Sequence, residues 1–229
     1  MKKNYKKLLF VALFVVLGLI ALRIPFTHII GSKSSFTIFD FMAPITGGFL
    51  GSWLGALAVL IVEIINFFIK GMALDTTTFI RFFPMLFAAI YFGTKQKGIG
   101  IVPLICIILF LSHPIGSHVF YYPITFWFIP IVLSFFKKRL FFNSIGATLT
   151  AHAVGSTAFL YAFNLPVSVW KSLMFIVPFE RLSFAVGITI SYLVINNILN
   201  YLLEKHHIII FRSLVNKKLI FNKSIFANI

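Results

Sequence analysis

The stretch FDFMAPITGGFLGSWLGA, residues 39–56, decides how the first part of the chain folds. It places an acid, a proline and several glycines between two long apolar runs. Gly47, Gly51 and Gly55 recur every four residues, so within one helix they would form a single small face for close packing. These three glycines are therefore our candidates for helix packing.

The length of the surrounding apolar region argues against one continuous helix. A helix over residues 36–70 would be ~52 Å long, whereas the hydrocarbon core of a bilayer is ~30 Å thick. We therefore expect a short helix after Asp40, with Pro44 in its early turns, and a tight turn near Gly51. The glycines would then let the two arms of this region pack closely against each other.

Composition identifies an integral membrane protein. Of the 229 residues, 60% are hydrophobic and only 11% are charged, and the mean hydropathy is +1.02. A soluble domain has about 25% charged residues. We predict one transmembrane helical domain over residues 1–204 and a basic cytoplasmic tail over residues 205–229.

The fold class that we expect is all-α, a polytopic transmembrane helical bundle. Apolar segments cover about 8–29, 37–50, 53–69, 77–93, 99–112, 119–136, 144–163 and 172–203. Several are too short for a full crossing, which takes about 20 helical residues. We therefore predict six to eight membrane segments, some of them short or re-entrant. Six crossings plus a hairpin over residues 99–136 fit as well as eight crossings.

The basic residues predict the orientation. If all eight segments cross, fourteen bases fall on one side: Lys2, Lys3, Lys6, Lys7, Lys95, Lys97, Lys137, Lys138, Arg139, Lys205, Arg212, Lys217, Lys218 and Lys223. The other side receives only Lys33, Lys70 and Lys171. Positive charge concentrates on the cytoplasmic side of membrane proteins, so both termini are expected in the cytoplasm of a multi-pass cell-membrane protein. We therefore attribute the net charge of +15 to basic residues that interact with membrane lipid, and we expect no nucleic acid as a partner.

Four polar residues lie in the second to fourth apolar segments, where burial of a charge is costly and usually serves a function. Asp40 begins the second segment. Glu63 and Asn66 share a helical face in the third, and Arg81 lies in the fourth. A carboxylate beside an amide suits an ammonium group, a proton or a polar ligand. The alternative is that Glu63 simply pairs with Arg81.

Glu180 and Arg181 place opposite charges side by side in the last apolar segment. Adjacent side chains on a helix point about 100° apart, so we expect each to need a separate partner. Pro178 suits a first helical turn, which predicts a helix start near residue 178 with Glu180 at its positive end. The two residues are either a capping acid and an interfacial arginine or part of a ligand site.

Histidines and aromatic residues complete the candidates. His113, His118 and His152 lie near segment ends, but no metal-binding motif accompanies them, so neither a metal nor a cofactor is expected. His152 shares a helical face with Gly155, and such a face lines a polar cavity or packs closely. Trp127 is either an interfacial aromatic residue or the wall of a site for a flat ligand. His118, His152 and Trp127 are included among the candidate ligand residues.

The chain shows no catalytic motif. It has no G-x-S-x-G, no H-E-x-x-H and no dense cluster of aspartates, and only five acidic residues in all. No catalytic residue is therefore predicted, and an intramembrane enzyme is the least favoured class.

The block D-x-x-A-P-I-x-G-G-x-x-G-S-x-x-G at residues 40–55, after a basic N-terminus and an apolar first helix, resembles the S-components of energy-coupling-factor (ECF) transporters. In that family a G-P-x-x-G region introduces an early helix; here Gly51 and Gly55 match its glycines, and Ser52 stands where proline is common. The first helix lacks the family's A-x-x-x-A pattern.

This resemblance implies a bundle of typically six helices that binds a vitamin-like small-molecule solute. It also implies a separate ECF coupling subunit and ATPases as partners. It transfers no ligand residue to this chain. The alternative is an autonomous secondary transporter that uses Glu63 or Glu180 as its proton site.

Overall fold

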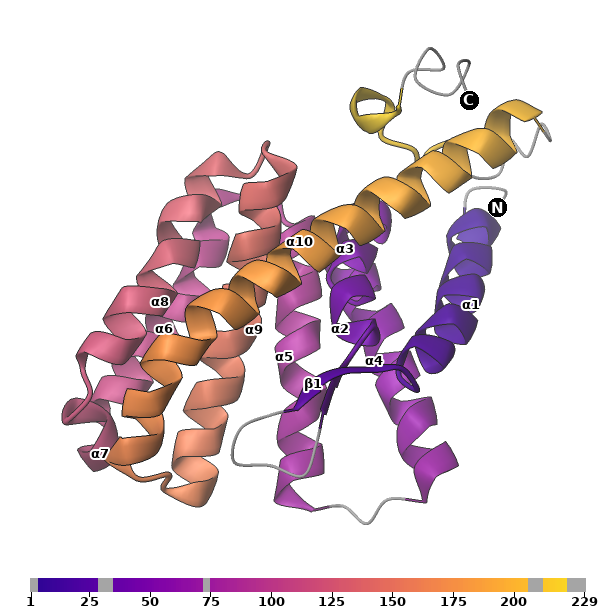
Figure 1. Ribbon diagram of the computed structural model, residues 1–229. Helices are drawn as coiled ribbons and strands as arrows, with labels where there is room; N and C mark the ends of the chain where they lie inside the picture. The colour runs from indigo at the N-terminus through magenta and orange to yellow at the C-terminus, as the bar shows by residue number, and fades with distance from the viewer. Residues whose placement is uncertain (1–3, 29–34, 72–74, 206–211, 222–229) are drawn as a thin grey trace.

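The computed structural model describes residues 4–28, 35–71, 75–205 and 212–221, and these residues are mostly helical (Figure 1). The longer helices are α1 (Asn4–Ala21), α4 (Ser52–Lys70), α5 (Thr76–Gly93), α6 (Ile101–Ser112), α8 (Tyr121–Leu133), α9 (Leu140–Phe163) and α10 (Val167–Lys205). The short ones are α2 (Phe39–Met42), α3 (Ile45–Leu50), α7 (Pro114–Ser117) and three 3₁₀ turns, η1 (Lys97–Gly100), η2 (Ser134–Phe136) and η4 (Lys217–Leu219). Each predicted apolar segment overlaps at least one of these helices.

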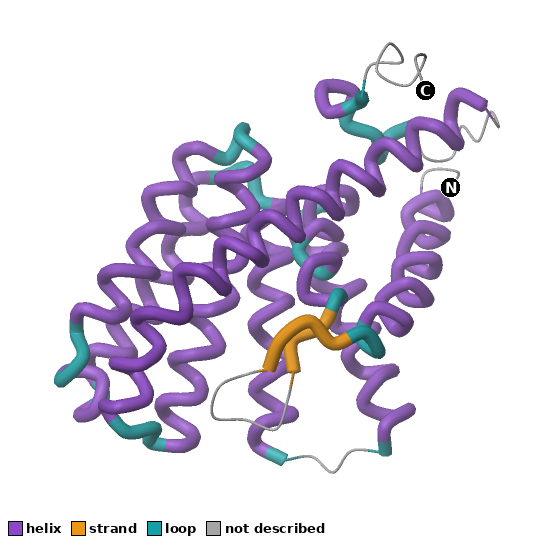
Figure 2. Tube along the Cα trace, viewed as in Figure 1, coloured by secondary structure: helices purple, strands orange, loops and turns teal. Residues whose placement is uncertain are grey.

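A small antiparallel sheet corrects the expectation of an all-α chain. Strand β1 (Pro25–His28) pairs with β2 (Ser35–Thr37), as Figure 2 shows in orange. The pairing continues where the Ile38 amide donates to the Ile24 carbonyl at 3.0 Å. These hydrogen bonds satisfy backbone groups at the point where the chain leaves α1 and turns toward α2. Such short strands carry too little hydrophobic alternation for sequence analysis to find them.

The predicted break at Gly51 is confirmed. Helix α3 ends at Leu50, α4 begins at Ser52, and Gly51 between them has φ +87°. A side chain at that φ is strained, which is why glycine is needed there. A Cβ atom at Gly51 would meet nothing within 4 Å. Gly51 thus makes the turn and does not pack, so its assignment to the packing face was wrong.

Gly47 and Gly55 lie where three helices come together. A Cβ atom on Gly47 would lie 1.9 Å from the Ala89 carbonyl oxygen of α5, and one on Gly55 would lie 2.5 Å from the Gly47 nitrogen. The Thr46 hydroxyl also donates to the Gly55 carbonyl at 3.1 Å. Helix α3 can therefore fit against both α4 and α5 only because these positions carry no side chain.

Three helices are long and apolar enough to cross a membrane, namely α4, α5 and α10, and shorter apolar helices include α6 and α8. The arm formed by α2 and α3 covers 12 positions, or ~18 Å at 1.5 Å per residue, which is short of a bilayer core. Many outward-facing side chains are apolar, among them Trp53 (81% exposed), Phe175 (80%) and Phe179 (76%). Exposed apolar surface of this kind is typical of an interaction with lipid or with another protein.

Helix α10 starts earlier than predicted. It begins at Val167 and runs through Pro178 without ending, so the expected start near residue 178 was wrong and Glu180 is not at a helix N-terminus. Its 39 residues correspond to ~58 Å, and α10 runs obliquely across the bundle in Figure 1. Such a helix must tilt or extend beyond a bilayer.

Part of the predicted tail packs back on this helix. Asn196 of α10 donates to the Asn216 carbonyl at 3.1 Å and accepts from the Asn216 amide at 2.7 Å. Asn197 makes the same kind of pair with the Leu219 carbonyl and the Phe221 amide. Leu214 is buried in the main apolar core. Residues 212–221 are therefore attached to the helical domain.

The connections divide between two ends of the bundle. The start of α1, the end of α10 and the α5–α6 and α8–α9 connections lie at one end, which is the top in Figure 1. The end of α4, the start of α5 and the α9–α10 connection lie at the other end.

The close approach at Gly47 leads to a first prediction. Gly47→Ala should lower the thermal stability of the purified protein, because overpacking typically costs about 1–3 kcal/mol and here the new methyl group meets rigid backbone. Gly98→Ala is the matched control, since a Cβ atom there meets nothing within 4 Å. Thermal unfolding in detergent should show a lower Tm for the first variant only. Equal Tm values would contradict the packing that we describe.

Candidate functional site

One cavity of about 140 Å³ collects six of the nine predicted ligand residues. They come from helices far apart in the sequence: Asp40 from α2, Glu63 from α4, Arg81 from α5, His152 from α9, and Glu180 and Arg181 from α10. Three of them, Asp40, Glu63 and Glu180, are acidic, and the whole chain has only five acidic residues. The cavity therefore concentrates negative groups that are rare elsewhere in a strongly basic chain.

The remaining wall of the cavity is largely apolar and aromatic. It consists of Phe36, Pro84, Met85, Ala151, Gly155, Ser156, Phe159, Leu165, Trp170, Leu173 and Val177. Sequence analysis missed most of these residues. Trp170 is fully buried and donates its indole N–H to the Leu165 carbonyl at 3.0 Å, and Phe36 belongs to the unpredicted strand β2. One part of this wall could be found from the sequence, because His152 and Gly155 share a helical face and both line the cavity.

Asp40 joins the sheet to helix α2. Its Oδ2 atom accepts hydrogen bonds from the Thr37 amide at 2.6 Å and from the Thr37 hydroxyl at 3.1 Å. The residue is buried. Asp40 therefore holds β2, and with it Phe36, against the cavity.

Arg181 and Glu180 contact each other, contrary to the prediction. The Arg181 Nη2 atom lies 2.8 Å from Glu180 Oε2. The helix directs the two Cβ atoms apart, but both side chains are long enough to bend toward each other beyond Cβ. The expectation that adjacent positions could not pair was therefore wrong.

The rest of the Arg181 environment is apolar and leaves donors unused. Its guanidinium carbon lies 4.4 Å from the ring centroid of Phe184 and 5.1 Å from that of Phe36. Nη1 donates a long hydrogen bond of 3.4 Å to the Thr148 hydroxyl. Among the described residues, Nε and Nη2 have no hydrogen-bond partner, so the close approach to Glu180 is an ion pair without hydrogen-bond alignment.

His152 has a structural role at the cavity wall. The Trp127 indole N–H donates to His152 Nδ1 at 3.1 Å, and His152 Nε2 lies 3.0 Å from the Tyr122 hydroxyl. Because the indole can only donate, Nδ1 is unprotonated, and the neutral ring carries its proton on Nε2. Both ring nitrogens are thus engaged, and His152 presents its ring, not a free nitrogen, to the cavity. Trp127 is fully buried behind it.

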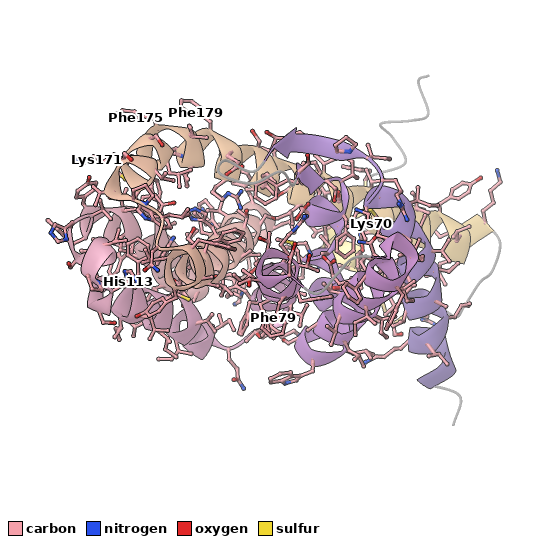
Figure 3. The ribbon with its side chains drawn as sticks, turned by 90° about the horizontal axis from the view of Figure 1, so that it is seen from below. Lys70, Phe79, His113, Lys171, Phe175 and Phe179 are labelled. Atoms are coloured by element: carbon pink, nitrogen blue, oxygen red, sulfur yellow. The ribbon has the colours of Figure 1, made fainter. Side chains whose placement is uncertain are left out.

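His118 lies outside the cavity. It is exposed next to α7, where its Nδ1 atom is 2.8 Å from the Pro114 carbonyl oxygen. His113 lies 3.1 Å from the Asn164 side chain, at the end of the bundle that Figure 3 views. The described part of the chain contains no group of three or more His, Cys, Asp or Glu side chains that could hold a metal ion.

A second, more polar cavity of about 410 Å³ adjoins the first. Glu63 and Arg81 line both, and the second also contains Arg23, Asn66 and Lys70. Asn66 is only 8% exposed, and its Oδ1 atom has no hydrogen-bond partner among the described residues. The two cavities therefore meet at Glu63 and Arg81.

Glu63 and Arg81, both in the described residues, do not form the ion pair that the alternative interpretation required. No contact within 4.0 Å joins their charged atoms. Arg81 Nη2 instead donates to the Ser35 carbonyl in β2 at 3.2 Å. Within the described part of the chain, the Glu63 carboxylate thus has no cationic group within 4.0 Å at the boundary of the two cavities.

Helix α5, which carries Arg81, is capped at its start and hydrogen-bonded to neighbouring elements at its end. At its start the Asp75 carboxylate accepts the Thr78 amide at 2.6 Å, and this hydrogen bond holds the pKa of Asp75 below its ordinary value. At its end Asn143 of α9 donates to the Phe92 carbonyl at 2.9 Å. The Tyr91 hydroxyl donates to the Pro130 carbonyl at 2.7 Å. Arg81 is therefore presented by a helix with restricted movement.

Comparison with known proteins gives no match: no family model, no curated protein and no solved structure is similar to this chain.

The His152 hydrogen bonds lead to a second prediction. His152→Ala should destabilise the protein, because it leaves the buried Trp127 indole N–H without an acceptor, at about 1–3 kcal/mol, and removes a hydrogen bond of the Tyr122 hydroxyl. Thermal unfolding in detergent should show a clear loss in Tm. His118→Ala, at an exposed position, is the control and should leave Tm nearly unchanged. A His152→Ala protein as stable as the control would contradict the structural role of this histidine.

Proposed function

We propose that this chain is a multi-pass cell-membrane protein that binds a small solute in the cavity between α4, α5, α9 and α10. The observation that carries the proposal is the convergence of Asp40, Glu63, Arg81, Glu180 and Arg181 on one cavity within an otherwise apolar bundle. Ionisable groups in such a bundle are costly, and they are usually retained for a ligand, an ion or a transport pathway. The volume of about 140 Å³ is close to that of an engineered cavity that accommodates benzene.

The distribution of charge supports an outward-facing cavity. Connections at the end where α1 starts and α10 finishes (Figure 1) include Lys95, Lys97, Lys137, Lys138 and Arg139. The positive-inside rule assigns that end to the cytoplasm.

The cavity residues belong to the opposite half of the bundle. Glu63 lies in the second half of α4, which runs toward the α4–α5 connection, and Arg81 lies in the first half of α5. His152 lies in the second half of α9, and Glu180 in the first half of α10. A solute would therefore enter from outside.

The mode of transport that we propose is that of an S-component, which binds the solute and depends on a separate coupling subunit and separate ATPases. The chain contains no G-x-x-x-x-G-K-[ST] motif of its own for nucleotide binding. The glycine block at residues 40–55, on which the resemblance rests, forms a broken helical arm that turns at Gly51. Outward-facing apolar surface, as on α10, is available for contact with lipid and with a membrane partner.

A secondary transporter is the second candidate, and one observation favours it. Glu63 borders both cavities and has no ion pair with any described residue, as expected of a carboxylate that takes up and releases a proton. Uptake into proteoliposomes driven by a pH gradient alone, without ATPase subunits, would identify this mechanism.

Native mass spectrometry of gently purified protein tests the proposed function. We expect a bound small molecule on the wild type and, from native membranes, additional masses of partner subunits. Ser156→Trp, which places an indole in the cavity, should lose the bound mass. Phe175→Trp is the matched control, because Phe175 points outward from α10 (Figure 3). A wild-type protein without any bound solute, or an equal bound mass on Ser156→Trp, would contradict the proposal.

A further inference from the structure

We infer that the solute is a small zwitterion, whose carboxylate is bound by Arg181 and whose ammonium group is bound by Glu63. This inference rests on the proposed function and specifies the class of its ligand.

Arg181 Nε has no acceptor among the described residues, and Arg181 Nη2 has only the ion pair with Glu180 at 2.8 Å, which lacks hydrogen-bond alignment. The residue is 4% exposed and lines the cavity, and its Nε and Nη2 atoms have no hydrogen-bond partner among the described residues. Buried donors without partners are rare because each costs free energy comparable to a lost hydrogen bond. Nε and Nη2 lie on one edge of the guanidinium plane, the geometry that binds a carboxylate through two parallel hydrogen bonds.

Glu63 requires a donor. Its carboxylate lines both cavities, and no hydrogen bond or ion pair within 4.0 Å joins it to another described side chain. Asn66 lies one helical turn further on, with its Oδ1 atom buried and also without a partner. A carboxylate and a carbonyl oxygen on one helical face are acceptors suited to an ammonium group, which has only donors.

The cavity is lined by charged groups of both signs. A purely anionic solute would meet three carboxylates, those of Asp40, Glu63 and Glu180, and a purely cationic one would meet Arg81 and Arg181. A solute of one sign would pair with only one of these two sets and would leave the other set without a ligand group of opposite charge. A zwitterion enters with no net charge and places each of its ionic groups beside an opposite one.

The walls and the volume of the cavity limit the size and polarity of the uncharged part of the ligand. Phe36, Phe159 and Trp170 supply aromatic surface, and Met85 and Val177 supply aliphatic surface. A compact, partly apolar body of about the size of one aromatic ring fits about 140 Å³. The adjoining polar cavity leaves room for the ionic ends.

Isothermal titration of the detergent-purified protein with four probes tests this inference. L-Phenylalanine carries both charges, 2-phenylethylamine carries only the ammonium group, 3-phenylpropionate carries only the carboxylate, and 2-phenylethanol carries neither. We expect L-phenylalanine to bind at least about tenfold more tightly than each of the other three, since a hydrogen-bonded charge contributes roughly 10-fold to 100-fold in affinity.

Substitutions assign each charge to its residue. Glu63→Gln should weaken L-phenylalanine about tenfold or more and leave 3-phenylpropionate unchanged. Arg181→Gln should weaken L-phenylalanine and leave 2-phenylethylamine unchanged. Glu204→Gln and Lys171→Gln, at exposed positions on α10, are the matched controls. The comparison of probes on the wild type needs no variant and so stands even if Arg181→Gln fails to fold.

Two results would overturn the inference: equal binding of a singly charged or uncharged probe, or no binding of L-phenylalanine. The mass spectrometry described above separates this failure from that of the proposed function. A bound solute of another charge class would retain solute binding and reject only the zwitterion. A protein without any bound solute would reject both.

Discussion

The close contact of α3 with α4 and α5 at Gly47 is the constraint on which the rest of the structure depends. Backbone atoms of Gly47 approach Ala89 and Gly55 so closely that no side chain fits between them. This contact places a short helical arm beside two long helices. As a result Asp40, which lies in the α2 part of this arm, lines the same cavity as Glu63 of α4 and Arg81 of α5.

Inside this frame the ionic groups are held differently. Asp40 is bound to Thr37, and Glu180 lies next to Arg181, so these carboxylates have partners within the protein. Among the described residues, Glu63 has no ion pair within 4.0 Å, Arg181 Nε has no hydrogen-bond partner, and Arg181 Nη2 has only its ion pair with Glu180. Buried ionic groups without complete partners reduce stability, and a protein retains them where a ligand completes the arrangement. This difference between ionic groups with and without complete partners is the physical basis of the proposed binding and of its charge selectivity.

Some of this arrangement could be predicted from the sequence, because the determining factors are local. The turn at Gly51 follows from length and glycine spacing. The cavity residues follow from the cost of a charge within an apolar segment, and this criterion found Asp40, Glu63, Arg81, Glu180 and Arg181. His118 was selected on a different ground, its position near a segment end, and it lies outside the cavity, exposed to solvent.

Other features depend on tertiary contacts. The pairing of Glu180 with Arg181 arises from bending of long side chains, which Cβ directions do not describe. The continuation of α10 through Pro178 shows packing prevailing over a local preference for a helix start. His152 looks like a ligand in the sequence, and only its contacts with Trp127 and Tyr122 show that its nitrogens are occupied. The short strands have no periodicity that a sequence could reveal.

An experimental density map of the protein purified together with its solute tests the central claim most directly. Our account predicts density for a compact molecule between Arg181 and Glu63, within hydrogen-bond distance, about 3 Å, of the Arg181 guanidinium. A map in which protein side chains close this space, or in which only a lipid chain occupies it, would contradict the account.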